Sequence, residues 1–408
     1  MSTSYRDTEP ENFGVLRPGE VRSANASAVL RYLLASGPTP RSTLADHLGL
    51  TRGPVTRIVA LLMERGLVCE GEAEPRPAGR GRPRVPVMIN PDALHTIAAH
   101  VGATQVTVSR VDLAGQVHAE RTAEHDGSPV SALEITSGLC NELSRCHPAR
   151  VLGIGAVSGG WVDATSGVIR DHPRLHWQDI AVRDVLEEAT GLRVYVDSAA
   201  HSHSVADIVF GLTFGVPDFV HVFIGNVIEM ATANDGRVHP GLDGFGGDLS
   251  NWIFDISGKP LPALEVISDF AVRDRARTEG ILRPDGTFED LVALSPHDER
   301  ARGLIISRAE RAARLVAGIA TIFAPSAIVV SSGVVATQEA VHTLEEHFEE
   351  LLRDRPRPEL IVSTNWRTPL ATAGAAIVVE KALLNDPLRR TTETLPQLRS
   401  VPAAQDGH

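Results

Sequence analysis

Apolar residues recur every three or four positions in three stretches of the first 66 residues, the spacing of amphipathic helices. The first stretch is NASAVLRYLLASG, which ends at Gly37 and Pro38; the second is PRSTLADHLGL, with Ser42 as its expected N-cap. The third is TRGPVTRIVALLMERG, with Thr51 as its cap. The residues expected to face inward are Val29, Leu30, Leu33, Leu34, Leu44, Ala45, Leu48, Val55, Ile58, Val59 and Leu62. Helix, glycine-containing turn and helix predict a helix-turn-helix.

Two short strands, GLVCEG and RVPVMIN, follow the third helix and extend the motif to a winged helix. The segment between them contains GRGRPR at residues 79–84, which would form the wing. Two alternatives stay open: an ordinary three-helix bundle with a solvated basic face, and a flexible solvated loop in place of a DNA-contacting wing.

Positive charge gathers at this end of an acidic chain. Residues 22–90 contain ten arginines, no lysine and five acidic residues, whereas the whole chain carries −12 and residues 91–408 carry −15. A basic segment on an acidic body favours a local contact with nucleic acid. We expect the third helix to enter the major groove and the wing to reach the minor groove. The residues expected to contact DNA are Arg41, Ser42, Thr51, Arg52, Gly53, Pro54, Thr56, Arg57, Arg80, Gly81, Arg82 and Arg84.

Beyond residue 95 the pattern changes to strands and helices in alternation. HTIAAHVGATQVTVSRVDLAGQVHAERTAEH predicts three strands, SALEITSGLCNELSRC a helix, and VLGIGAVSGG a buried strand followed by a glycine loop. A second set runs from DFVHVFIGNVIEMATANDG through the helix RAARLVAGIATIFA to the strand AIVVSSGV. A pattern met twice predicts two related α/β lobes with a cleft between them.

Five stretches in this order resemble the ROK family, which groups sugar kinases with sugar-responsive repressors: GIGAVSGGWVDATSGVIRDHPRL, LRVYVDSAAHSHSVAD, GRVHPGLDGFGGDLSN, FAPSAIVVSSGV and LATAGAAIV. The N-terminal GLTRGPVTRIVALLMERGLV and GRGRP resemble its repressor branch. The resemblance implies an α/β, actin/hexokinase-like two-lobed domain preceded by an all-α, winged-helix domain. The expected division is a flexible arm over residues 1–21, the DNA-binding domain over 22–90, the ROK domain over 91–386 and a flexible tail over 387–408.

The resemblance also implies a sugar pocket. In ROK kinases an Asn-Asp pair supplies the catalytic base, and YVDSAAHS places Asp197 there, with Val196 instead of asparagine. The family's Glu-x-x-His pair corresponds to Asp248 and Asn251, and a further glutamate to Glu265. A helix cap is the alternative role for Asp197. The ligand-binding residues implied to share one pocket are Gly159, Gly160, Asp197, Asp248, Asn251 and Glu265.

The phosphate-binding and zinc-binding motifs of ROK kinases are degraded. The first phosphate loop has His100 in place of a carboxylate and Ala103 in place of a glycine, and Ile228 and Glu229 are expected to block or repel phosphate in the second. The residues Lys259–Ala263 read KPLPA where the family has zinc cysteines. We therefore expect no catalytic residues, no metal and no cofactor.

The histidines, the cysteines and the lack of a long apolar run bear on metal binding and location. His201 and His203 are interpreted as helix-surface histidines rather than metal ligands, and the three cysteines, which form no CxxC pair, as free thiols. No apolar run approaches the roughly 18 residues of a membrane span and no signal pattern opens the chain, so we expect a cytoplasmic protein.

These features together predict a DNA-binding transcriptional regulator, more specifically a repressor. Its partners would be double-stranded operator DNA, a sugar or sugar-derived effector, and further copies of the chain in a dimer or dimer of dimers. The alternatives are a bifunctional sugar kinase and a regulator with a vestigial pocket and no effector.

Overall fold

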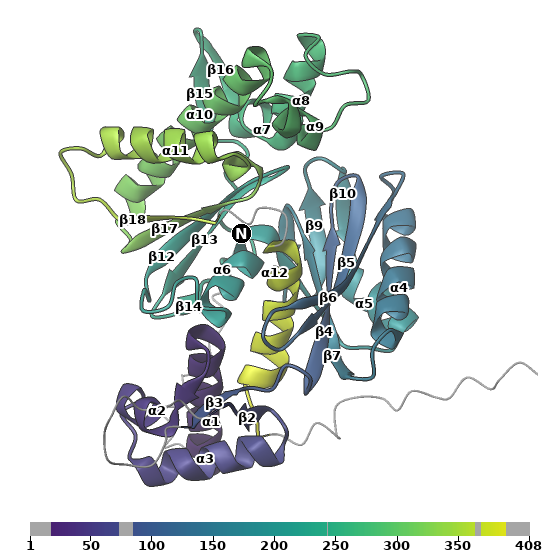
Figure 1. Ribbon diagram of the computed structural model, residues 1–408. Helices are drawn as coiled ribbons and strands as arrows, with labels where there is room; N and C mark the ends of the chain where they lie inside the picture. Colours follow the sequence, from purple (N-terminus) through teal and green to yellow (C-terminus); the bar gives the residue numbers. More distant parts are fainter. Residues whose placement is uncertain (1–17, 73–84, 243, 364–368, 389–408) are drawn as a thin grey trace, which may run out of the picture.

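The computed structural model describes residues 18–72, 85–242, 244–363 and 369–388. A small helical unit lies at one end of the molecule, and two α/β lobes lie beyond it (Figure 1). Each lobe contains a five-stranded sheet. The α/β, two-lobed fold with an N-terminal winged helix is confirmed.

The helical unit is a winged helix-turn-helix whose three helices pack on a small sheet. Strand β3 lies between β1 and β2 and is antiparallel to both. All the residues expected to face inward are buried, except Leu34 and Leu48, which are partly buried against the same core. The elements are α1 (Pro18–Ser36), β1 (Thr39–Pro40), α2 (Arg41–His47), α3 (Arg52–Glu64), β2 (Val68–Glu70) and β3 (Pro86–Ile89).

The helix starts differ from the sequence-based prediction. Ser42 is not the N-cap of α2: Pro40 holds that position, and Ser42 is the second residue of the helix. Pro40 pairs with β3 in extended conformation, so the helix begins directly after it. Thr51 does stand at the N-cap of α3, but its side chain accepts no capping hydrogen bond. Helix α1 begins at Pro18, inside the segment that the sequence assigned to a flexible arm.

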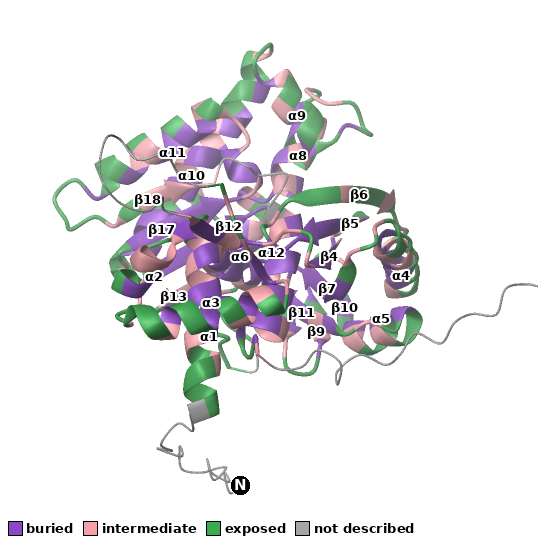
Figure 2. Cartoon of the chain, turned by 60° about the horizontal axis from the view of Figure 1, so that its bottom comes forward, coloured by how far each residue is buried: buried purple, intermediate pink, exposed green. Residues whose placement is uncertain are grey.

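The first lobe is a mixed sheet in the order β11-β7-β4-β5-β6, with a small antiparallel sheet β10-β9-β8 beside it. The central strands β4 and β7 are almost entirely buried, whereas the edge strand β6 is mostly exposed (Figure 2). The elements are β4 (Leu94–Val101), β5 (Gln105–Asp112), β6 (Val117–Glu124), α4 (Pro129–Arg145), β7 (Arg150–Ser158), β8 (Trp161–Asp163), β9 (Val168–His172), β10 (Trp177–Ile180), α5 (Val182–Thr190) and β11 (Val194–Ser198).

The second lobe has the sheet order β14-β13-β12-β17-β18, with β12 parallel to β17 and antiparallel to β13. Its elements are β12 (Phe219–Ile224), β13 (Ile228–Asn234), β14 (Arg237–Val238), β15 (Ile253–Ile256), β16 (Lys259–Pro262), α7 (Ala263–Val266), α8 (Asp269–Thr278), α9 (Phe288–Leu294), α10 (Glu299–Phe323), β17 (Ala327–Ser331), the 3-10 turn η1 (Gly333–Val335), α11 (Gln338–Leu351) and β18 (Glu359–Val362).

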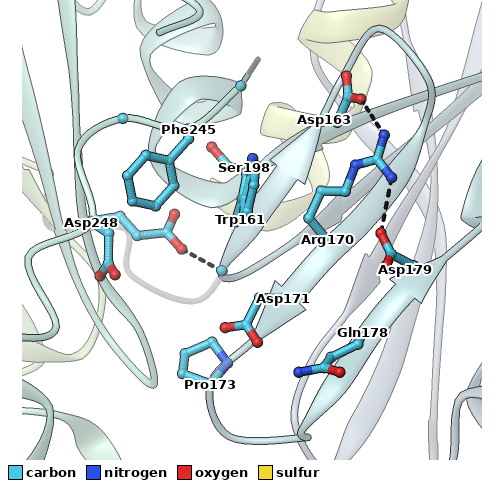
Figure 3. A pocket seen from close by; sticks show the side chains of 14 residues that line it. Trp161, Asp163, Arg170, Asp171, Pro173, Gln178, Asp179, Ser198, Phe245 and Asp248 are labelled. Carbon is cyan, nitrogen blue, oxygen red and sulfur yellow. Dashed lines mark hydrogen bonds and ion pairs between the residues drawn. The ribbon is translucent and has the colours of Figure 1, made fainter. Parts of the chain in front are cut away.

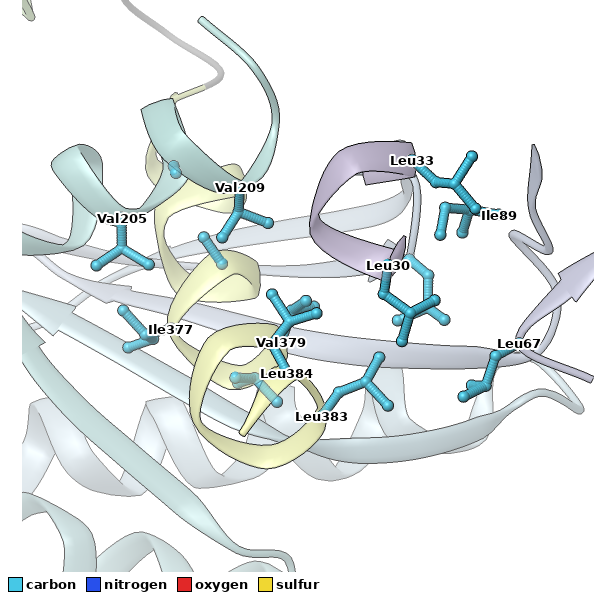
Figure 4. Close-up of a cluster of buried hydrophobic side chains, with 14 of the residues drawn as sticks. Leu30, Leu33, Leu67, Ile89, Val205, Val209, Ile377, Val379, Leu383 and Leu384 are labelled. Carbon is cyan, nitrogen blue, oxygen red and sulfur yellow. The ribbon is translucent and has the colours of Figure 1, made fainter. Parts of the chain in front are cut away.

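Two helices connect the lobes to the winged helix. Helix α6 (Ala199–Val209) follows β11 directly, and α12 (Pro369–Val378) packs on α6, β4 and β7 before it continues as the π-helix η2 (Val379–Leu384). Side chains of α1, α6, α12 and η2 form one continuous hydrophobic cluster, so the winged helix shares its core with the two-lobed unit (Figure 4). The residues of this cluster labelled in the figure are Leu30, Leu33, Leu67, Ile89, Val205, Val209, Ile377, Val379, Leu383 and Leu384.

Candidate functional site

The start of α3 presents an exposed polar and basic surface. Its opposite face is buried, because apolar residues recur there at helical spacing. Arg52 and Arg57 form no ion pair within the described part of the chain, so both guanidinium groups are available to an external anion. The exposed residues of this surface are Thr51, Arg52, Gly53, Thr56 and Arg57.

The other residues expected at DNA differ in their surroundings. Arg41 donates to Glu70 Oε1 at 2.8 Å and to Met63 Sδ at 3.5 Å, so its guanidinium is already engaged inside the winged helix. Ser42 and Pro54 are half-buried. The wing residues Arg80, Gly81, Arg82 and Arg84 lie outside the described residues.

A cavity of about 900 Å³ lies between the two lobes (Figure 3). This volume is within the range of roughly 300–1,000 Å³ that small-molecule sites occupy. Both lobes contribute to the wall, so a ligand here would contact both. The lining residues are Gly160, Trp161, Asp163, Arg170, Asp171, Pro173, Gln178, Asp179, Ser198, Glu229, Gly244, Phe245, Gly246 and Asp248.

Carboxylates dominate the polar part of this wall. Arg170 is the one cation among the lining residues, and it already donates to Asp163 and Asp179, each at 2.9 Å. Hydrogen bonds from Ser166 and Arg170 lower the pKa of Asp163 to about 2, against the effect of its burial. The five lining carboxylates outnumber this cation, so the cavity favours a ligand that bears hydroxyl groups or positive charge.

An aromatic pair forms the apolar part of the wall. Trp161 and Phe245 meet edge to face with their ring centroids 5.2 Å apart, and their exposed fractions are 37% and 53%. Trp161 comes from the first lobe and Phe245 from the second. Aromatic faces next to hydrogen-bonding groups suit a ligand with both an apolar face and polar edges, such as a sugar ring.

Glu229 joins the two lobes at the floor of the cavity. Its Oε1 accepts the Gly160 N–H at 2.6 Å, and its Oε2 accepts the Ala200 N–H at 3.3 Å, in the first turn of α6. Burial raises the pKa of Glu229 to about 7, although these two N–H groups lower it and Asp248 and Asp197 raise it further. The side chain therefore changes charge near neutral pH.

The residues implied for a sugar pocket are distributed over several places. Gly160 and Asp248 line the 900 Å³ cavity, and Asp248 Oδ1 accepts the Ser250 N–H at 2.8 Å. Asp197 is only 3% exposed and does not line the cavity itself; its Oδ1 accepts the Ser198 N–H at 2.9 Å. Ser198, not Asp197, occupies the N-cap position of α6, and the Ala200 N–H in the first turn of this helix donates to Glu229 instead.

Glu265 and Asn251 are not in this cavity, so the expectation that all six residues converge on one pocket is wrong. Glu265 lines a separate cavity of about 140 Å³ together with Arg275, Arg308 and Arg311. Helix α7 is a single turn with Ala263 fully buried, and a residue two positions later points about 200° away. Asn251 is exposed in the turn before β15.

The cavity beside the loops to which the family resemblance assigned phosphate binding is small. The cavity there is about 140 Å³ and is lined by His100, Ala103 and Gly159, among others. Val227 packs so closely on Gly159 that a Cβ at this glycine would lie 2.5 Å from Val227 Cγ1. The space is well below the range of roughly 300 Å³ and more that drug-sized ligands occupy.

Ile228 and Glu229 are not the residues that obstruct this space, which corrects the sequence-based interpretation. Neighbouring residues of a strand point to opposite faces. Ile228 is fully buried in the core of the second lobe, and Glu229 faces the larger cavity. Val227 takes the obstructing position, and Ser332, at φ 77° and ψ −160°, occupies a backbone conformation that glycine favours.

The histidines of the HSHS segment are not surface residues. His203 is 3% exposed, and its ring stacks on those of His221 and Phe223, with centroid distances of 5.5 and 5.2 Å. His201 Nδ1 lies 2.8 Å from Asp197 Oδ2. The sequence-based interpretation failed because α6 lies between the two lobes and is covered on both sides.

The donor set for the family's structural zinc is missing. KPLP forms strand β16, and Asn251 stands at the position implied for histidine. The three cysteines are unpaired, and all of them precede β16 by more than 100 positions. Within the described ranges, no three His, Cys, Asp or Glu side chains are grouped so that they could hold a metal ion. No helix among the described residues is both long and apolar enough to cross a membrane.

Sequence reasoning missed the residues that define most of the cavity wall. Trp161 and Phe245 belong to the motifs GGWVD and LDGFGGD. Glu229 belongs to GNVIEM and was assigned to the phosphate loop instead of this cavity. A tryptophan directly after two glycines of a loop is the one signal that pointed to an exposed aromatic site. Contact between GGWVD and LDGFGGD depends on the closing of one lobe on the other.

The two α/β lobes with a cavity between them have the architecture of sugar-kinase-like proteins. The chain belongs to the ROK family, whose model matches residues 96–382.

Curated relatives of the chain are transcriptional regulators by name. A transcriptional regulator of Mycobacterium bovis is 28% identical over 382 residues, which cover 89% of this chain and 86% of the relative. The xylose repressor of Bacillus spizizenii is 23% identical over 246 residues, covering 58% of this chain and 62% of that protein.

Solved structures support the fold. A ROK family transcriptional regulator, a homologue of the Escherichia coli Mlc protein, matches with a TM-score of 0.68 at 21% identity, covering 90% of this chain and 97% of that chain. A ROK family glucokinase from Streptomyces griseus, in complex with glucose and AMPPNP, matches with a TM-score of 0.60 at 18% identity, covering 69% of this chain and 98% of that chain. The kinase lacks a counterpart for about a third of this chain.

Proposed function

We propose that this protein is a DNA-binding transcriptional regulator, specifically a repressor, with α3 as its recognition helix. The observation that carries the proposal is the exposed start of α3, where Arg52 and Arg57 stand without ion-pair partners among the described residues. Arginine is the side chain that most often reads guanine in the major groove. Relatives named as a transcriptional regulator and as a repressor add support.

The two-lobed unit acts in this proposal as a ligand-sensing body without phosphoryl transfer. A nucleotide needs a phosphate cradle of small residues and free N–H groups, whereas Val227 packs against Gly159 and His100 stands at the first loop. The 900 Å³ cavity with its aromatic pair and carboxylates offers a place for a sugar or a cationic sugar derivative. The ligand would act through different affinities for two arrangements of the protein.

Two copies of the chain would bind one operator. A single winged helix buries a small area on DNA, and pairing two half-sites multiplies the affinity. We therefore propose a dimer, or a dimer of dimers, that binds two inverted half-sites, and a cytoplasmic location where DNA is accessible. The domain borders at residues 21, 90 and 386, and the wing contacts of Arg80 and Arg82, stay predictions.

Selection of bound duplexes from a random DNA library tests the proposal directly. The purified full chain should enrich an inverted repeat whose half-site centres are separated by whole helical turns of about 10 base pairs. Affinity should fall steeply with salt, because arginines that contact phosphates release counterions. Enrichment of no sequence, together with equal affinity for all duplexes, would rule out sequence-specific regulation.

A bifunctional sugar kinase is the alternative from another functional class, and it is favoured only by fold neighbours such as the Streptomyces griseus glucokinase. We expect no binding of ATP and no phosphorylation of any hexose by the purified protein, because the phosphate side of the cleft is about 140 Å³. Isothermal titration with ATP and magnesium, with and without sugar, is the measurement. Sugar-dependent ATP turnover that disappears in Asp197→Asn would restore the kinase interpretation.

A further inference from the structure

Two neighbouring residues of the π-helix η2 connect the winged helix to the inter-lobe site. Glu380 accepts two hydrogen bonds from the Arg31 guanidinium of α1, at 2.6 and 2.7 Å. Lys381 Nζ lies 3.6 Å from Asp197 Oδ2, at the end of β11. Consecutive residues of a helix point in different directions, so Glu380 faces the DNA-binding unit while Lys381 faces the site.

The end of η2 is held by further contacts with the winged helix. Ser27 Oγ donates to the Leu384 carbonyl oxygen at 2.5 Å, and Ser23 Oγ donates to Asp386. Arg65, which follows α3, donates to the carbonyl oxygens of Pro387 and Leu388. The first residues of the segment that the sequence assigned to a flexible tail therefore belong to this junction. A displacement of η2 would be transmitted to α1 and to the end of α3.

A second connection runs parallel to the first. Helix α6 begins one residue after Ser198, beside Asp197, and ends against α1. Gly211 lies so close to α1 that a Cβ there would be 2.1 Å from the Ala35 carbonyl oxygen. Phe214 meets Tyr32 edge to face with ring centroids 5.5 Å apart. Since α12 packs on α6 as well, the two connections form one block between Asp197 and the winged helix.

The π-helix is the part of this block whose backbone departs from regular α-helix. One extra residue per turn makes a π-turn less stable than an α-turn, and such turns are rare and concentrate at functional sites. Val379, Leu383 and Leu384 hold η2 in the shared core beside Leu30 and Leu33 (Figure 4). Return to α-helical register would rotate Glu380 and Lys381 together, because they are consecutive residues.

We propose that η2 is the switch that couples occupancy of the inter-lobe site to the orientation of the winged helix. A ligand that engages Asp197, or that moves Ser198 beside it, competes for this carboxylate with Lys381 and with His201, whose Nδ1 lies 2.8 Å from the same oxygen. Release of Lys381 lets η2 repack and loosens the Glu380–Arg31 pair. This inference rests on the proposed function and assigns the residues that regulate it. By thermodynamic reciprocity, DNA that holds the winged helix in place also alters the affinity of the site.

Hydrogen–deuterium exchange of the full chain tests the coupling without any ligand or DNA. In Asp197→Asn and in Lys381→Met, we expect amides of α1 and η2 to exchange roughly threefold faster or more, because the junction opens locally more often. Lys259→Met is the matched control, since Lys259 is the only other lysine of the chain and lies on β16. Lys381→Arg keeps the positive charge and should retain the exchange rates of the unmodified protein.

Exchange in α1 that is unchanged by Asp197→Asn and Lys381→Met, or changed equally by Lys259→Met, would overturn the coupling. The charge exchange Arg31→Glu with Glu380→Arg provides a second check: the double variant should exchange more slowly than either single variant. Additive effects of the two single variants would contradict a direct pair.

Measurements of DNA affinity then distinguish the proposed coupling through η2 from the proposed function as a DNA-binding regulator. With a duplex from the random library, the combined variant Asp197→Asn and Arg31→Met should lose less affinity than the sum of the single losses, because both act through one junction. Failure to select any duplex while the exchange pattern holds would refute DNA binding and retain the coupling. Strict additivity with intact DNA binding would refute the coupling and retain the regulator.

Discussion

Replacement of Arg52 or Arg57 with alanine is expected to lower the affinity for the selected DNA site roughly 10- to 100-fold, the equivalent of about 1–3 kcal/mol per base contact. Both guanidinium groups stand at the exposed start of α3, without ion-pair partners among the described residues. The loss should be larger for the selected site than for random duplex, since base contacts carry sequence preference. Fluorescence anisotropy over a salt series measures both affinities.

Arg283→Ala provides the control for this experiment, because Arg283 is 82% exposed on the second lobe and distant in sequence from α3. Its affinity for DNA should equal that of the unmodified protein. The wing is tested in the same series: the Arg80→Ala and Arg82→Ala double variant should weaken binding to all sequences and reduce the salt slope by roughly one unit per lost phosphate contact. If the affinity for DNA is unchanged in Arg52→Ala and Arg57→Ala, α3 is not part of the DNA-binding interface.

A cationic sugar is expected to bind the inter-lobe cavity more tightly than its neutral counterpart, and more tightly as the pH rises from 6 to 8. Burial raises the pKa of Glu229 to about 7, so the carboxyl is neutral below this pH and charged above it. A sugar with an aminomethyl group stays protonated across this range, as a lysine amine does. Titration calorimetry at several pH values should show roughly tenfold or more gain in affinity, the scale of a close interfacial ion pair.

Two variants and one control test the predicted binding of a cationic sugar. Glu229→Gln should abolish the pH dependence. Trp161→Ala should lower the affinity for both sugars by roughly threefold to thirtyfold through loss of the aromatic face. Glu265→Ala should change nothing, because Glu265 lines a different cavity. A broad screen of sugars and amino sugars without any thermal shift, together with normal regulation by Asp197→Ala in cells, would favour the regulator without an effector.

The local periodicity of the sequence predicted the winged helix well. The spacing of Val55, Ile58, Val59 and Leu62 determines which face of α3 is buried, because the helical repeat is a property of the backbone alone. The exposed face then follows by elimination. The cap of α2 was wrong because Pro40 is drawn into strand β1 by pairing with β3, far along the chain.

The positions of the site residues could be predicted only in part from local sequence patterns. The motif around Asp197 correctly placed this residue at the end of a buried strand. The alternation along β13 assigns Ile228 and Glu229 to opposite faces, but which face meets a cavity depends on where the other lobe packs. Glu265 does not line the inter-lobe cavity, because in the short helix α7 its side chain points away from the side on which Ala263 is buried.

The sequence by itself determined the family, the order of the elements, the buried face of each helix and the basic character of the N-terminal unit, because these depend on composition and on repeats within one element. Only the tertiary structure decided that Trp161 meets Phe245, that Glu229 joins Gly160 to α6, and that consecutive residues of η2 contact Arg31 and Asp197. The physical reason is the large sequence separation between the residues that make these contacts. Arg31 and Glu380 are 349 positions apart, and no local pattern encodes a contact that forms only when two lobes and a helix close on one core.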